Sequence, residues 1–240
     1  MTCFLTSMPI IDEESGAFAD VNGFLTEMRA VLEESFRMLF VCSDPDNYER
    51  TDFYSSASRT AFERSGFKVT EFSILDRRTQ DRAAELVANA DLIVLAGGHV
   101  PTQNRFFTEI GLKELLSGFD GVLMGISAGS MNSAETVYAQ PECEGEAVDP
   151  GYERFFPGLG LTKTMLLPHY QDCKDDVLDG LRVFEDIAYP DSVGREFIAI
   201  QDGSYLLIEN GSEELRGEYY LIKDGVISDA LYGGKGDTIA

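Results

Sequence analysis

The residue pattern with the clearest chemical meaning is the pentapeptide Gly125-Ile126-Ser127-Ala128-Gly129. A continuous apolar run precedes it and a helix-like stretch follows it. A serine at such a strand-to-helix turn is held in a strained conformation that exposes its hydroxyl as a nucleophile. The flanking glycines let the backbone turn tightly, and the helix N-terminus adds positive potential. The pattern predicts a nucleophilic serine; the alternative is a Gly-Ser-Gly turn without chemistry.

A nucleophilic serine needs a general base, and the chain has only two histidines, His99 and His169. Each follows an apolar run, and open α/β sheets place their sites at the carboxyl ends of such strands. Either histidine could therefore reach Ser127. Asp202 follows a third run and is a candidate for the carboxylate that orients the base. Taken singly, each is more simply a surface or turn residue, so the hypothesis depends on the three together.

These side chains need a scaffold, which the alternation of apolar runs and helix-like stretches predicts. Near-continuous apolar runs indicate strands buried on both faces, as in parallel sheets. Strand–helix alternation predicts right-handed crossovers and an α/β fold with a doubly wound, mostly parallel, flavodoxin-like sheet. The expected strands are 37–42, 67–72 (nearer an edge), 91–96, 121–125, 164–167 and 197–200. The expected helices are 18–34, 49–65, 80–89, 101–117 and 174–188.

After residue 200 the pattern changes to short strands separated by Asn210-Gly211 and Asp224-Gly225, which are hairpin turn signals. We expect an antiparallel C-terminal extension at one edge of the same domain. Because no linker, repeat or low-complexity tract interrupts the chain, residues 1–240 are expected to form a single domain. The acidic segment 135–153 is either a functional loop that closes over the site or simply a solvated loop.

Composition argues against several other functions. Asp and Glu number 42 against 19 Lys and Arg, a formal net charge of −23, which disfavours nucleic acid and anionic membranes as partners. The sequence shows no transmembrane run and no signal-peptide pattern at its start. Four scattered cysteines fit reduced thiols and a cytoplasmic location. With two histidines and no Cys-x-x-Cys motif, we expect no metal site, and the chemistry requires no cofactor.

The order of the candidate residues along the chain discriminates between hydrolase types. An α/β-hydrolase also carries Gly-x-Ser-x-Gly, but its order is serine, acid, histidine. Here His169 precedes Asp202, so that fold is not expected. A class I glutamine amidotransferase would have cysteine in place of Ser127, so ammonia transfer from glutamine is not expected either.

With these residues in this order, the sequence resembles the dipeptidase E (α-aspartyl dipeptidase) and cyanophycinase group of serine peptidases. The resemblance extends from about Leu39 to Ile208. It implies a fold related to class I glutamine amidotransferases, and hydrolysis of short peptides, including dipeptides with N-terminal aspartate. The matching segments are Ala96-Gly97-Gly98-His99, the serine pentapeptide, Val148-Asp149-Pro150, Pro168-His169-Tyr170 and Asp202-Gly203.

Carried over to the matching positions, the resemblance implies a role for each residue. Ser127 would be the nucleophile, His169 the base and Asp202 the orienting acid. The backbone N–H groups of Gly98 and Ala128 would form the oxyanion hole. Acyl-transfer chemistry needs donors of this kind where negative charge develops.

Two departures from the family pattern bear on specificity. His99 stands where the family has Asn, and Asp202 stands where it has Glu, which is one methylene longer. An aspartyl substrate needs a cation or fixed donors. By their neighbourhood, Arg105 and Arg154 are candidate substrate-binding residues together with His99; the alternative is that both are ordinary surface arginines.

Two other functions stay open at this stage, and the oligomeric state is undetermined. A non-catalytic protein that binds small molecules or peptides can keep the same scaffold and pocket. A cyanophycinase-like hydrolase would instead cleave a β-aspartyl-arginine polymer. Labelling of Ser127 by a serine-directed probe separates an enzyme from a binding protein.

Overall fold

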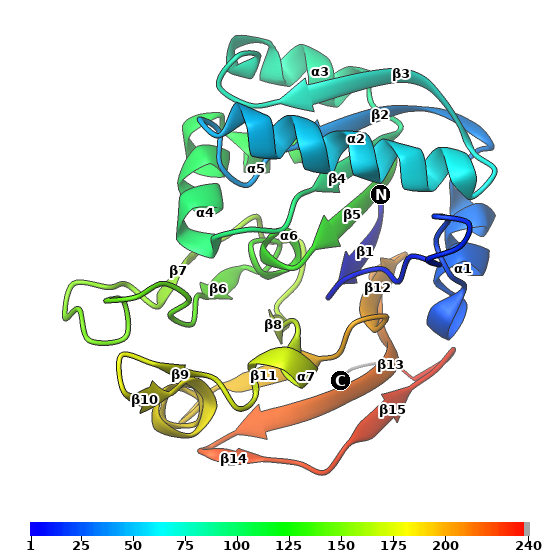
Figure 1. Cartoon of the computed structure of the whole chain (residues 1–240). Coiled ribbons are helices and arrows are strands. Elements are labelled where there is room, and N and C mark those ends of the chain that lie inside the picture. Colours follow the sequence, from blue (N-terminus) through cyan, green and yellow to red (C-terminus); the bar gives the residue numbers. More distant parts are fainter. Residues whose placement is uncertain (238–240) are drawn as a thin grey trace.

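The computed structural model describes residues 1–237, and its central feature is an 11-stranded sheet (Figure 1). Its strands are β1 (Thr2–Thr6), β2 (Ser35–Val41), β3 (Lys68–Leu75), β4 (Leu92–Leu95), β5 (Val122–Ile126), β8 (Met165–Leu167), β11 (Glu196–Ile200), β12 (Tyr205–Glu209), β13 (Ser212–Lys223), β14 (Val226–Ile227) and β15 (Leu231–Gly233). The order is β3-β2-β4-β5-β1-β12-β13-β11-β8, with β14 and β15 paired to β13. The five strands from β3 to β1 are mutually parallel, which confirms the predicted α/β class and places β3 at an edge.

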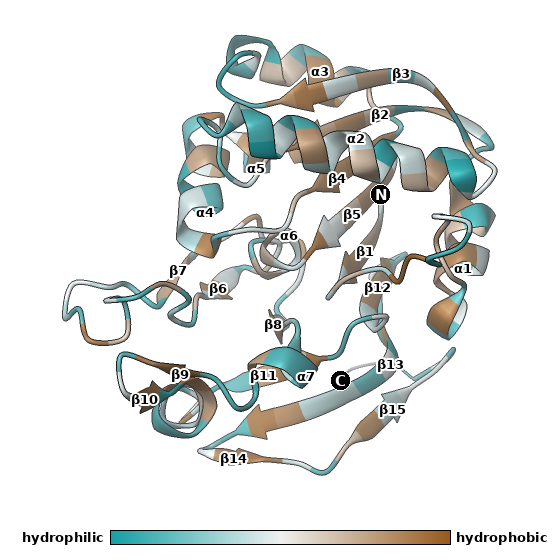
Figure 2. Ribbon diagram, viewed as in Figure 1, coloured by the Kyte–Doolittle hydropathy of each residue, from teal (hydrophilic) through white to brown (hydrophobic). Residues whose placement is uncertain are grey.

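Helices cover both faces of this parallel part. They are α1 (Phe24–Val31), α2 (Tyr48–Arg64), α3 (Ala83–Asn89), α4 (Val100–Glu109) and α5 (Leu112–Leu116), with single 3-10 turns at Val21–Gly23 and Gln80–Arg82. Helices α1 and α2 pack on the face that carries Phe4 and Phe40, whereas α3, α4 and α5 pack on the face that carries Leu5 and Leu95. Figure 2 shows the strands in brown between helices whose outer sides are teal. Burial on both faces explains why the strand sequences are continuous apolar runs.

The two hairpin turns predicted from sequence are present. Asn210-Gly211 joins β12 to β13, and Asp224-Gly225 joins β13 to β14. All four turn residues have positive φ, between 49° and 84°, which is the conformation of a type I′ turn.

The antiparallel strands expected after residue 200 are present, but β12 and β13 are not edge strands of the sheet. Strands β12 and β13 lie inside the sheet, between β1 and β11. The reason is β1, a strand that the sequence interpretation did not include. It pairs with β5 in parallel and with β12 antiparallel, and its Phe4 and Leu5 are fully buried.

Several helices differ from their predicted bounds because residues with positive φ interrupt them. Gly111 separates α4 from α5, and Gly23 precedes a shorter α1. The expected helix 174–188 is wrong for its first half, because Asp179-Gly180 forms a turn in a small hairpin of β9 (Val177–Leu178) and β10 (Leu181–Arg182). A π-helical turn, Val183–Ala188, and the short α8, Tyr189–Asp191, follow.

The segment between the serine pentapeptide and β8 contains a second small sheet, of β6 (Thr136–Tyr138) and β7 (Phe155–Pro157). The acidic loop between β6 and β7 therefore begins and ends at two paired strands. Among residues 1–237, no helix combines the length and the apolar character needed to cross a bilayer.

Candidate active site

The expected triad residues each follow a separate strand: Ser127 follows β5, His169 follows β8 and Asp202 follows β11. They do not meet for the reason that the sequence suggested, because β8 and β11 run antiparallel to β5. They converge because β13 is twelve residues long and pairs with β12 through its first half and with β11 through its second half. The carboxyl ends of β5 and β11 therefore point toward each other near the middle of β13.

Ser127 occupies the turn between β5 and the short helix α6 (Ala128–Met131) with φ 50° and ψ −112°. A non-glycine residue at positive φ is strained, and such strain is held only where the surroundings fix it. Here the Ser127 N–H donates to the carbonyls of Thr6 (3.1 Å) and Ser7 (3.0 Å) at the end of β1. A Cβ on Gly129 would lie 2.7 Å from that of Leu95, so only glycine permits this packing.

His169 and Asp202, which the sequence analysis proposed as base and acid, lie in contact. His169 Nδ1 lies 2.8 Å from Asp202 Oδ1, and His169 begins the short helix α7 (Tyr170–Cys173) with φ 58°. Burial alone would raise the pKa of Asp202. Hydrogen bonds from His169 and from Ser7 outweigh it and hold the pKa below its usual value of 3.8. Asp202 is therefore ionised at neutral pH and can fix the orientation of the imidazole.

Ser7 is a residue of the site that the sequence analysis did not identify. Its hydroxyl donates to Asp202 Oδ1 (2.6 Å) and accepts the backbone N–H of His169 (2.8 Å). Its carbonyl accepts the N–H of Ser127. The side chain is completely buried. Ser7 directly follows β1, so its position at a strand end was the only signal in the sequence that could have identified it.

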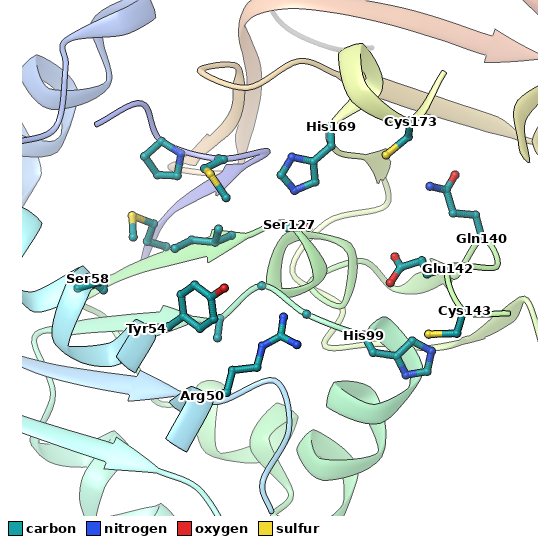
Figure 3. Close-up of a pocket in the computed structure, with 18 of the residues that line it drawn as sticks. Arg50, Tyr54, Ser58, His99, Ser127, Gln140, Glu142, Cys143, His169 and Cys173 are labelled. Atoms are coloured by element: carbon teal, nitrogen blue, oxygen red, sulfur yellow. The ribbon is translucent and has the colours of Figure 1, made fainter. Parts of the chain in front are cut away.

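Ser127 and His169 line the same cavity, and the imidazole lies over the serine in Figure 3. Within the described residues, no hydrogen bond joins the Ser127 hydroxyl to the His169 ring. Serine–histidine contacts are often loose in an unliganded site and tighten when substrate binds.

Two backbone donors lie beside the nucleophile where the sequence predicted an oxyanion hole. In the described chain, the N–H groups of Gly98 and Ala128 have no protein acceptor. The Gly97-Gly98 turn passes close to the serine, since a Cβ on Gly97 would lie 3.3 Å from Ser127 Cβ. Free N–H groups in this position can stabilise an oxyanion.

The cavity has a volume of about 890 Å³, within the range of small-molecule sites. Figure 3 shows Tyr54 and Ser58 on one side of Ser127, Gln140 and Glu142 on the other side, and Arg50 below the serine with its guanidinium toward the cavity. Glu142 is an exposed residue that lines the cavity, and desolvation of its carboxyl there raises its pKa to about 7. Glu146 raises this pKa further and His169 lowers it.

His99, the other sequence candidate, lines the cavity but is engaged elsewhere. Its Nε2 lies 2.8 Å from Glu146 Oε1 and its Nδ1 lies 2.8 Å from Thr102 Oγ1. His99, Cys143 and Glu146 present ligand atoms close enough together to hold a cation. Glu146 already bonds to both other residues, because its Oε1 contacts the His99 ring and its Oε2 accepts the backbone N–H of Cys143.

A second group with metal-ligand spacing consists of His169, Asp172 and Asp202. Two of its members, His169 and Asp202, already contact each other at 2.8 Å, so a cation there would have to displace that contact.

The two arginines proposed as substrate-binding residues lie outside the cavity lining. Arg154 pairs with Asp191 at 2.9 Å, and Asp191 also accepts the hydroxyl of Tyr138. Arg105 is exposed on α4. Among the described lysines and arginines, Arg50 alone lines the cavity.

Residues 12–216 match the family model of peptidase family S51. The chain belongs to peptidase family S51. The match covers most of the chain and includes all three residues of the expected triad, so the protein is a serine peptidase of the dipeptidase E family, acting on peptide substrates.

A structural comparison agrees with this S51 assignment. The fold is similar to that of a protein from Listeria monocytogenes EGD-e named as a putative peptidase E. The TM-score is 0.59 and the sequence identity 17%, over 90% of this chain and 97% of the other. At this identity the likeness concerns the fold. None of the curated proteins matches this S51 chain.

Proposed function

We propose that this S51 peptidase hydrolyses short peptides through a Ser127–His169–Asp202 triad and an acyl-enzyme. Ser127 Oγ attacks the peptide carbonyl while His169 Nε2 accepts its proton. Asp202 holds the imidazole by its Nδ1 and stabilises the imidazolium. The N–H groups of Gly98 and Ala128 bind the oxyanion, and His169 then protonates the leaving amine. Water activated by His169 releases the acyl group and regenerates Ser127.

The observation that carries this proposal is the shared hydrogen-bond network at the site. Ser7 contacts all three members of the triad, through its hydroxyl to His169 and Asp202 and through its carbonyl to Ser127. A strained serine, an oriented histidine and an ionised aspartate around one cavity are the arrangement that covalent catalysis requires.

The finer part of the proposal is that the substrates include dipeptides with N-terminal aspartate. It is supported by membership of the dipeptidase E family. Comparing kcat/KM for Asp-Leu, Asn-Leu and Ala-Leu tests it. Equal values for the three would remove the aspartyl preference and leave the serine peptidase.

Hydrolysis of Asp-Leu and Ala-Leu by the wild type and by Ser127→Ala tests the mechanism. We expect kcat to fall by about a thousandfold or more, because no other group in this triad supplies a nucleophile. The thermal unfolding midpoint of the variant, measured alongside, shows that the fold is retained. A variant that is folded and hydrolyses either peptide at the wild-type rate would refute the proposed nucleophile.

A further inference from the structure

The cavity extends beyond the triad along one face of α2. The residues of α2 that line it are Arg50, Tyr54, Ala57, Ser58 and Ala61. Their spacing of three and four places them on the same side of the helix. A cation therefore lies toward the N-terminal end of this stripe, and small side chains follow it. The small side chains leave room between the helix and the sheet.

The opposite walls of this part are apolar. We call it the apolar chamber, and define it by Ala57 and Ala61 of α2, Phe40 and Met124 of the sheet, and Pro9 and Phe18 of the segment before α1. Ile126, directly before Ser127, also lines the cavity, so the chamber opens beside the nucleophile. An apolar space of this kind favours an apolar side chain, because burial removes that group from water.

Arg50 lies at the mouth of the chamber and lacks an acidic partner. Within residues 1–237 its guanidinium forms no ion pair, although the chain carries an excess of acidic residues. Its one recorded side-chain interaction is with the ring of Tyr54, 5.6 Å from the centroid. Figure 3 shows the guanidinium directed into the cavity. An unpaired guanidinium is well suited to bind a carboxylate.

The other end of the cavity has the opposite polarity. Gln140 is 7% exposed, and its Oε1 is buried without a hydrogen-bond partner in the described chain. Glu142 lines the same end, and Asp176 does too. Acceptors and carboxylates here favour an ammonium group. The two ends therefore match the two charges of a dipeptide, with Ser127 between them.

We propose that Arg50 and the apolar chamber bind the second residue of a dipeptide substrate, with its C-terminal carboxylate on Arg50 and an apolar side chain in the chamber. The free amino group of the first residue lies toward Gln140 and Glu142. This assigns a substrate class, dipeptides with a large apolar second residue, and rests on the proposed peptidase function. The carboxylate and the side chain of the second residue are attached to the same Cα. Arg50 and the chamber can bind both because they lie next to each other on one face of α2.

The chamber is tested with Asp-Leu and Asp-Ala. Each fully buried methylene contributes about fourfold to affinity, so we expect wild-type kcat/KM to favour Asp-Leu by at least about tenfold. Ala57→Leu fills the chamber, and should reduce this preference to about twofold or less while Asp-Ala is still cleaved. Ser56→Leu is the matched control, because Ser56 is the neighbouring exposed residue of α2 outside the lining. This control should keep the wild-type preference.

The role of Arg50 is tested with Arg50→Met and three ligands. We expect the variant to weaken binding of Asp-Leu and Asn-Leu by about tenfold each, and that of Asp-leucinamide, which lacks the C-terminal carboxylate, by less than twofold. Arg59→Met removes a charge from the same helix at a residue paired with Glu63, and should change none of the three. A penalty that disappears with Asn-Leu instead would assign Arg50 to the aspartyl side chain and overturn this part of the proposal.

Dissociation constants measured on Ser127→Ala separate this inference from the proposed function. Binding that favours Asp-Leu over Asp-Ala, and loses that preference in Ser127→Ala combined with Ala57→Leu, supports the chamber whether or not the wild type turns over. Equal binding of the two dipeptides refutes the chamber, even if Ser127 proves to be the nucleophile.

Discussion

Replacing Ser7 with alanine removes one hydroxyl that contacts both His169 and Asp202, and should lower kcat much more than it changes KM. The side chain is completely buried, and its two hydrogen bonds measure 2.6 Å to Asp202 Oδ1 and 2.8 Å from the His169 N–H. None of the residues lining the cavity is altered by this substitution. A positioning role therefore predicts that kcat and KM respond differently.

The expected magnitudes follow from these contacts. A buried N–H left without an acceptor costs about 1–3 kcal/mol, and a hydrogen bond to a carboxylate contributes about 1.5–3 kcal/mol. Together these terms predict that the free energy of unfolding falls by about 2.5–6 kcal/mol. A small displacement of the base–acid pair can cost up to about a hundredfold in rate. We expect kcat to fall by about ten- to a hundredfold and KM to change by less than threefold.

The assay is steady-state hydrolysis of Asp-Leu, with urea unfolding of the same preparations. Ser65→Ala is the matched control. The buried Ser65 hydroxyl likewise accepts a backbone N–H, that of Phe18 (2.8 Å), and donates to a carbonyl, that of Ala61 (2.7 Å). The control should lose a similar amount of stability with kcat within twofold of the wild type. A folded Ser7→Ala enzyme whose kcat is also within twofold would refute the positioning role.

Three further predictions concern the same cavity. Asp202→Asn removes the charge that faces the His169 Nδ1, so kcat for Asp-Leu should fall by about a thousandfold or more; a loss below tenfold would contradict the triad. Desolvation of its carboxyl in the cavity raises the pKa of Glu142 to about 7 from an ordinary 4.5, so its ionisation opposes folding increasingly as pH rises from about 4.5 to 7. The melting temperature of Glu142→Gln should therefore exceed that of the wild type at pH 8 and equal it near pH 4, whereas a pH-independent difference would count against this environment. Gly98→Ala places a Cβ 2.6 Å from Ser43 Cβ at a positive φ, so the loop must shift and the free energy of unfolding should fall by about 1–3 kcal/mol. If the Gly98 N–H serves the oxyanion hole, kcat should also fall at least tenfold; an unchanged kcat in the folded variant would remove that N–H from the mechanism.

The strands around the triad were predictable because each is buried on both faces and is therefore a continuous apolar run. The two hairpin turns at Gly211 and Gly225 could also be predicted, because two-residue hairpin turns require positive φ, which glycine adopts readily. Strand β1 escaped detection because its apolar run, Cys3-Phe4-Leu5, is only three residues long and is bounded by threonines. Without β1, the positions of β12 and β13 within the sheet could not be derived.

The site was predictable one residue at a time, but its assembly was not. Ser127, His169 and Asp202 could be proposed from strand ends, yet their convergence depends on how β13 divides its pairing between β12 and β11. No motif or residue pattern within β13 indicates that its two halves pair with different strands. Arg50 was missed for a related reason, because only the packing of α2 against the sheet shows which of its side chains reach the cavity.

The most direct test of the account is the site of covalent labelling by a fluorophosphonate probe, located by peptide mass spectrometry. We predict one adduct per chain, on Ser127, which is absent from Ser127→Ala and forms at least a hundredfold more slowly in His169→Ala. Folded wild-type protein that cleaves Asp-Leu and carries no adduct on Ser127 would contradict the central claim.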